Sequence, residues 1–131
     1  MTLPQAVVVH GLADVRRALA KRRPVTILSP PGAALFLGPA AWEAMIRLAR
    51  AEHPDVMAPD LLDCAHATGL ALAAIRLGLS GLVLWPEAPA RAGVLAIAST
   101  LGAIVLEEAP PATTLESWLR DGPDDSGRRL R

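Results

Sequence analysis

A long stretch in the second half of this chain contains almost no charge. Between Ala67 and Leu106 only Arg76, Glu87 and Arg91 are charged, whereas the chain-wide charged fraction of 20% would place about eight charges there. The apolar pattern of this stretch predicts two helices and a strand, and the helices have almost no polar face. Such helices must be covered on every side. A domain of 131 residues is too small to bury every side of these helices within itself, so we expect a partner surface, most simply a second copy of the chain.

The composition fits one aliphatic domain. Hydrophobic residues make up 52% of the chain and aromatic residues only 3%, so the core must be built from Leu, Val, Ile and Ala. Thirteen basic and 13 acidic residues give a net charge of zero. Because nucleic-acid binding requires an excess of basic charge, we expect no nucleic-acid partner. We expect a single α/β domain over residues 1–120 and a polar, frayed tail over residues 121–131.

The charge-poor stretch does not have the pattern of a membrane span. Its charged residues and the prolines Pro86 and Pro89 interrupt it, so no run reaches the roughly 18 apolar residues that a span needs. Residues 1–9 have neither a basic region nor a long apolar segment, which argues against a secretory signal. The sequence therefore predicts a soluble, cytoplasmic protein with no membrane partner.

Short apolar runs alternate with helical patterns along the chain. The runs predict strands at Ala6–His10, Val25–Ser29, Asp60–Cys64, Gly81–Trp85 and Ala103–Glu107. The helical patterns cover Leu12–Arg22, Pro39–His53, Gly69–Leu77 and Pro89–Gly102, and a last short helix holds Leu115, Trp118 and Leu119. We expect Pro30–Gly38 to be a stiff loop that packs its apolar residues, Leu35, Phe36 and Leu37, under the following helix.

This alternation is typical of an open parallel sheet of about five strands with helices on both faces, a three-layer α/β fold. The strand Asp60–Cys64 is less apolar than the others and follows Pro59, so we place it at an edge. That placement favours the strand order 3-2-1-4-5, with 2-1-3-4-5 as the alternative. In both orders, right-handed crossovers put the two charge-poor helices on the same face.

The two charge-poor helices define a predicted interface. Apolar residues occupy more than one side of each helix, so some must face the sheet and others must face outward. A homodimer that buries the outward side is therefore expected. The candidate interface residues are Leu70, Ala73, Ile75, Val94, Ile97 and Ala98.

A ligand site is expected where the strands end. In open parallel sheets, ligands bind outside the carboxyl ends of the strands, at the point where the strand order reverses. Neither of the first two strands is followed by a glycine-rich phosphate motif, and Pro30 and Pro31 remove N–H donors, so we expect no nucleotide cofactor. The candidate ligand-binding residues at the strand ends are His10, Ser29, Gly32, Asp63, His66, Trp85 and Glu87.

Asp63, Cys64 and His66 form the densest cluster of reactive side chains. They precede a predicted helix, and a helix N-terminus lowers the pKa of a thiol; His66 would then act as the base and Asp63 would orient it. The structural alternative is that Cys64 is a small apolar residue that ends the strand, Asp63 or Thr68 caps the helix and His66 is exposed. A metal site would need His10 to join this cluster. The spacing lacks the dense motifs of metal sites, so no metal is expected.

No motif in the sequence names a reaction. The favoured interpretation is a non-enzymatic, homo-oligomeric binding or interaction module with a small-ligand site at the strand ends and no cofactor. One alternative is a small enzyme that uses Asp63, Cys64 and His66 on a small-molecule substrate. Another is a subunit that docks on a different protein through its apolar helical face.

Overall fold

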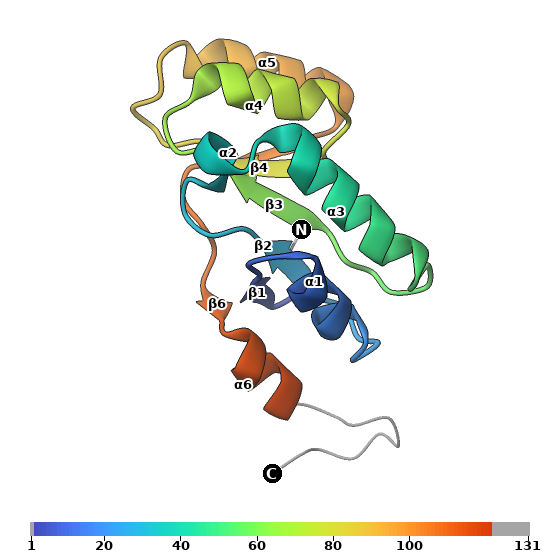
Figure 1. The fold of residues 1–131 in the computed structure, drawn as a ribbon. Helices are drawn as coiled ribbons and strands as arrows, with labels where there is room; N and C mark the ends of the chain where they lie inside the picture. Colours follow the sequence, from blue (N-terminus) through green and yellow to red (C-terminus); the bar gives the residue numbers. More distant parts are fainter. Residues whose placement is uncertain (1, 122–131) are drawn as a thin grey trace.

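The computed structural model describes residues 2–121, and Figure 1 shows their arrangement. The strands are β1 (Ala6–Val8), β2 (Thr26–Leu28), β3 (Asp60–Asp63), β4 (Gly81–Val83), β5 (Ile104–Leu106) and β6 (Ala112–Thr113). The helices are α1 (Leu12–Leu19), α2 (Ala33–Phe36), α3 (Pro39–Ala51), α4 (Thr68–Arg76), α5 (Arg91–Leu101) and α6 (Leu115–Arg120). All strand pairs are parallel, so the α/β class with a parallel sheet is confirmed. The expected tail lies outside the described residues from residue 122 onward.

The six strands lie in the order β5-β4-β3-β2-β1-β6. Both predicted orders and the count of five strands are therefore wrong. β3, predicted at an edge, lies in the middle of the sheet. Its aspartates suggested an exposed strand, but Asp60 and Asp63 are only 1% and 4% exposed. Each carboxylate accepts hydrogen bonds from donors within the chain, and these bonds offset the cost of burying it.

The crossover helices all cover one face of the sheet. From β1 to β5 each connection moves one strand in the same direction, and right-handed crossovers then place α1, α3, α4 and α5 on the same side (Figure 1). A single core cluster joins these helices to strand residues such as Val7, Ile27, Leu62 and Leu82. The prediction of helices on both faces is wrong because the strand order does not reverse between β1 and β5.

The opposite face of the sheet is covered by non-helical chain. A smaller cluster there contains Ala6, Leu28 and Leu61, with Leu3 from the N-terminal segment packed against it. The hydroxyl of Thr26 donates to Pro4 O at 2.8 Å, which ties the N-terminal segment to β2. The connection from β5 to β6 also runs down the side of the sheet away from α1 and α3 (Figure 1).

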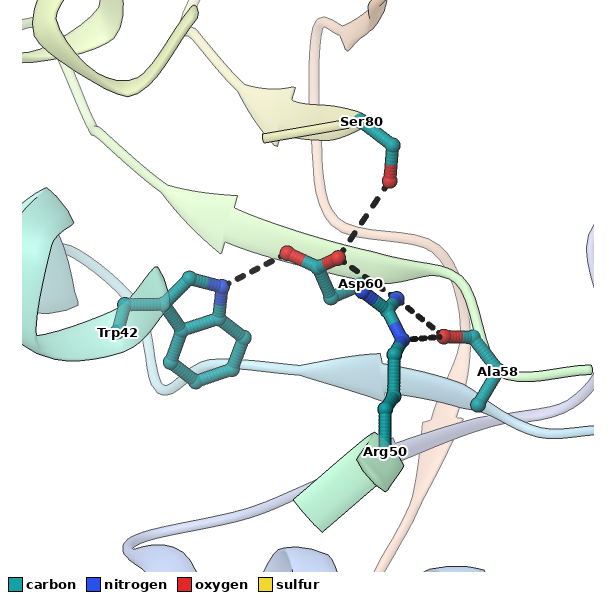
Figure 2. A network of polar contacts seen from close by, with 5 residues as sticks. All are labelled: Trp42, Arg50, Ala58, Asp60 and Ser80. Atoms are coloured by element: carbon teal, nitrogen blue, oxygen red, sulfur yellow. Dashed lines mark hydrogen bonds and ion pairs between the residues drawn. The ribbon is translucent and has the colours of Figure 1, made fainter. Parts of the chain in front are cut away.

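A buried polar network joins α3 to the start of β3, as Figure 2 shows. Asp60 Oδ2 accepts from Trp42 Nε1 at 2.9 Å, and Asp60 Oδ1 accepts from Arg50 at 2.8 Å and from Ser80 Oγ at 3.4 Å. Arg50 also donates through Nε to Ala58 O at 2.9 Å. This network lies at the amino ends of the strands and satisfies the one acidic residue that begins β3.

Local sequence signals explain several element boundaries. Pro39 occupies the first turn of α3, where its missing N–H costs nothing. Gly102 ends α5 in a left-handed conformation, with φ of 76°. Thr114 caps α6 by accepting from Ser117 N at 3.1 Å. None of the helices within residues 2–121 has the length and apolar character needed to cross a bilayer.

Candidate functional site

The polar residues that end β2 and β3 hold a backbone turn. Asp63 Oδ1 accepts from Ala65 N at 2.9 Å, and Ala65 has a left-handed φ of 51°. The hydroxyl of Ser29 accepts from Asp63 N at 2.9 Å and donates to Pro30 O at 3.0 Å. Because both side chains are buried and have these partners, their local role is to fix the turn that follows β3.

Cys64 lies inside the core. It is 0% exposed and its Sγ is 3.7 Å from Leu62 O. Burial and the nearby Asp63 carboxylate raise the pKa of the thiol to about 12. Successive side chains of a strand point to opposite faces, so Asp63 and Cys64 point away from each other despite their adjacency. The structure therefore does not bring the two side chains into one site.

His66 and Trp85 meet at the surface above the same turn. Their ring centroids are 6.1 Å apart with an interplanar angle of 45°. Trp85 N donates to Ala65 O at 2.8 Å, which ties the end of β4 to the turn. Both rings are exposed, and Glu87 lies exposed in the loop beyond. These residues form an aromatic surface rather than a pocket.

The loop after β2 contains the single-turn helix α2. Gly32 precedes it with a left-handed φ of 67°. Leu35, Phe36 and Leu37 are 54%, 72% and 40% exposed, so the expectation that they pack under the next helix is wrong. The reason is geometric: the short α2 buries only its two alanines and turns its larger side chains outward.

The predicted interface residues divide between core and surface. Ile75, Val94 and Ala98 are 3%, 2% and 1% exposed and belong to the main core cluster, so they offer no surface to a partner. Leu70 and Ala73 are half-buried on α4. Ile97 is 43% exposed on α5.

A hollow of about 240 Å³ opens at the carboxyl ends of β1 and β6. It lies where the strand order reverses, because the chain returns from β5 and places β6 beside β1. Among the residues predicted to bind a ligand, only His10 lines it. The remaining lining residues are Val8, Asp14, Ala112, Thr113, Thr114, Leu115 and Glu116.

The polar side chains of the hollow come from the starts of α1 and α6. His10 N donates to Asp14 Oδ2 at 2.9 Å, and His10 Nδ1 lies 3.6 Å from the same oxygen. Asp14 is in the first turn of α1 and Glu116 is in the first turn of α6. No lysine or arginine of the described chain lines the hollow. His10 is therefore the one side chain of this lining that can carry a positive charge.

Most residues of the hollow were missed by the sequence reasoning. Asp14, Thr113 and Glu116 have the pattern of ordinary helix starts, where acidic and hydroxyl side chains stabilise the first turn. β6 is two residues long and gives no periodic signal. Only the pairing of β6 with β1 brings these residues next to His10.

Within residues 2–121, no three His, Cys, Asp or Glu side chains are grouped so that they could hold a metal ion. No protein-family model matches the chain, and no curated protein sequence matches it. A functional conclusion therefore depends on the geometry of the chain itself.

Proposed function

We propose that this chain is a non-enzymatic, homo-oligomeric binding module whose small-ligand site is the hollow between β1 and β6. The observation that carries the proposal is the position of the hollow. It lies at the carboxyl ends of the strands, where the strand order reverses, and it is lined by His10, Asp14 and Glu116. Open parallel sheets bind their ligands at such points.

The lining favours a small organic cation. Asp14 and Glu116 supply negative charge, and no lysine or arginine of the described residues lines the hollow; its one basic side chain is the imidazole of His10, 3.6 Å from Asp14. Val8 and Leu115 supply an apolar surface for a short alkyl group. The volume of about 240 Å³ is below the roughly 300–1,000 Å³ of sites for drug-sized ligands. A short alkylammonium ion that carries a hydroxyl group fits these properties.

The state of Cys64 argues against the enzymatic alternative. With a pKa of about 12, the thiol stays protonated at neutral pH, and the thiolate is the reactive form. Its burial also keeps a substrate away, while His66 lies exposed on the surface. A nucleophile–base pair requires the two side chains within hydrogen-bond reach of each other.

Exposed apolar residues support self-association. Leu95, Ile97 and Leu101 on α5 are 37%, 43% and 62% exposed, and Ile104 on β5 is 39% exposed. No charged residue occurs between residues 92 and 106. Large exposed apolar side chains grouped on neighbouring elements are typical of interaction surfaces. Because the chain has zero net charge, a second copy meets little electrostatic repulsion.

The ligand proposal is tested by titrating the protein with ethanolammonium, and with the neutral ethylene glycol and the anionic glycolate as probes of similar size. We expect ethanolammonium to shift the amide resonances of Val8, Thr113 and Leu115 with an affinity of about 1 mM. Glu116→Gln should weaken this binding severalfold. Glu108→Gln, an exposed carboxylate outside the hollow, is the matched control and should leave it unchanged. Equal shifts with all three probes, or none with ethanolammonium, would refute the ligand site.

Self-association is tested by sedimentation velocity at micromolar concentration. We expect a species of twice the chain mass that dissociates on dilution. A clean monomer at all concentrations would refute the homo-oligomer and leave the ligand site to be judged on its own titration.

A further inference from the structure

The strand β5 has an unpaired edge. Within the described residues it pairs with β4 alone. Ile104 N donates to Ser80 O at 2.8 Å, and Leu106 O accepts from Leu84 N at 2.9 Å. Alternate residues of a strand direct their backbone groups to the same side, so the N–H and C=O of Val105 point away from β4. Backbone N–H and C=O groups that point away from the sheet in this way can hydrogen-bond to another strand.

The two edges of the sheet differ in how they are protected. β6 forms the other edge, is two residues long and follows Pro110 and Pro111, which have no N–H to offer. Short strands and prolines are the usual means of preventing edge pairing. β5 has neither proline nor charge within it, and the adjacent α5 exposes apolar side chains. The sheet is therefore open to extension at β5.

We propose that β5 pairs antiparallel with β5 of a second copy, about a twofold axis at Val105, and joins the two sheets into one. This inference deepens the self-association proposed above and rests on it. Val105 N–H donates to the partner's Val105 C=O, and the reverse bond completes the pair. Ile104 then lies opposite the partner's Leu106 on the same face, where its exposed side chain gains an apolar neighbour.

The acidic residues after β5 favour this orientation. Antiparallel pairing separates the two Glu107 side chains by four residue steps, about 13 Å, which exceeds the roughly 8 Å Debye length in physiological salt. Parallel pairing in register would place them about 4.8 Å apart. The twofold axis is perpendicular to the sheet, so both α5 helices lie on the same side of the joined sheet.

A second copy fits this edge better than the rest of the chain does. The described residues end at Asp121, after α6, which follows the opposite edge strand β6. Residues 122–131 contain Leu130 as their one large apolar side chain, so they are poorly suited to cover an apolar edge. A second copy, in contrast, brings a strand and a helix of matching character.

The mode of pairing is tested with two lysine variants of the full chain. Ile104→Lys places a charge at the β5 edge, and Leu48→Lys places the same charge on α3, where Leu48 is 48% exposed, as the matched control. In sedimentation velocity we expect Ile104→Lys to weaken the dimer about tenfold or more and Leu48→Lys to leave it unchanged. Hydrogen exchange of the wild type supplies a second readout, because Val105 N–H should exchange more slowly as the protein concentration rises.

The outcomes separate this inference from the proposal on which it rests. A wild-type dimer that persists in Ile104→Lys, with Val105 N–H exchanging at the same rate at every concentration, would refute edge pairing and leave self-association through another surface. A wild-type monomer would refute both. A dimer that Leu48→Lys weakens as much as Ile104→Lys does would also overturn the β5 edge as the interface.

Discussion

Replacing Arg50 by methionine should destabilise the protein by about 2–3 kcal/mol. Asp60, its partner, is 1% exposed, and its Oδ1 accepts from the Arg50 guanidinium at 2.8 Å. Removing one member of a buried ion pair costs about 3–5 kcal/mol, because the other charge is left without compensation. Arg50 is 39% exposed, so water screens part of the interaction, and Trp42 still donates to the carboxylate. Both facts lower the expected cost.

Arg47→Met on the same helix is the matched control. Arg47 is 65% exposed and forms an ion pair with Glu43 at 3.0 Å, four residues away. Such surface pairs contribute about 0.3–0.5 kcal/mol. Urea unfolding followed by tryptophan fluorescence measures both variants, and the Arg50 variant should lower the midpoint by about 1–2 M. Equal midpoints for the two variants would refute the argument that Asp60 requires a buried cationic partner.

A double-mutant cycle identifies the cause of the effect. Asp60→Asn removes the charge and keeps an oxygen that accepts from Trp42. In that background Arg50→Met should cost about 1–2 kcal/mol less than in the wild type, because no buried charge is left behind. The bonds from Arg50 to Ala58 O are lost in both backgrounds and cancel. A cost that is the same in both backgrounds would assign the effect to Ala58 and to packing.

Two further predictions concern stability. The pKa of Cys64 is about 12 in the folded protein, so between about pH 9 and pH 12 only the unfolded chain loses this proton. In that range the wild type should lose about 1.4 kcal/mol of stability per pH unit relative to Cys64→Ala. Parallel pH profiles of the two proteins in urea unfolding would contradict the buried thiol. Gly81→Ala should destabilise the protein by about 1–3 kcal/mol, because an added Cβ would lie 2.7 Å from Leu61 Cδ2. Gly93→Ala on α5 has open space around it and should stabilise the protein by up to about 1 kcal/mol. Thermal melts that shift in the same direction for both variants would contradict this packing.

The elements of the fold were predictable because their signals are local. The predicted helix Pro39–His53 is observed as Pro39–Ala51, and the predicted strand Gly81–Trp85 is observed as Gly81–Val83. Apolar periodicity, prolines and caps act within a few residues, so the sequence of each segment contains them. Strand β3 shows where this reasoning fails. Its acidic residues indicated an edge, but donors from other elements, Trp42 and Arg50 of α3 and Ser80 before β4, stabilise the buried Asp60 carboxylate in the centre of the sheet.

The candidate site was predictable in kind but not in composition. Strand ends in a parallel sheet are sites for ligands, and His10 was identified on that basis. Asp14 and Glu116 were not identified, because each resembles a residue that stabilises the start of a helix. Asp63 and Cys64 were grouped because they are adjacent, although the alternation of a strand points them to opposite faces.

The amino-acid sequence by itself determined the kinds of element, their order along the chain and the α/β class, because these follow from interactions between near neighbours. The tertiary structure decided the strand order, and with it the single helical layer, the hollow between β1 and β6 and the open edge at β5. Which strands become neighbours depends on contacts between distant segments, such as β6 against β1, and no local pattern encodes those contacts. The charge-poor stretch illustrates both levels. Its composition indicated a covered surface, and the fold placed part of it in the core and left other residues exposed, among them Leu77, Trp85 and several residues of α5 and β5.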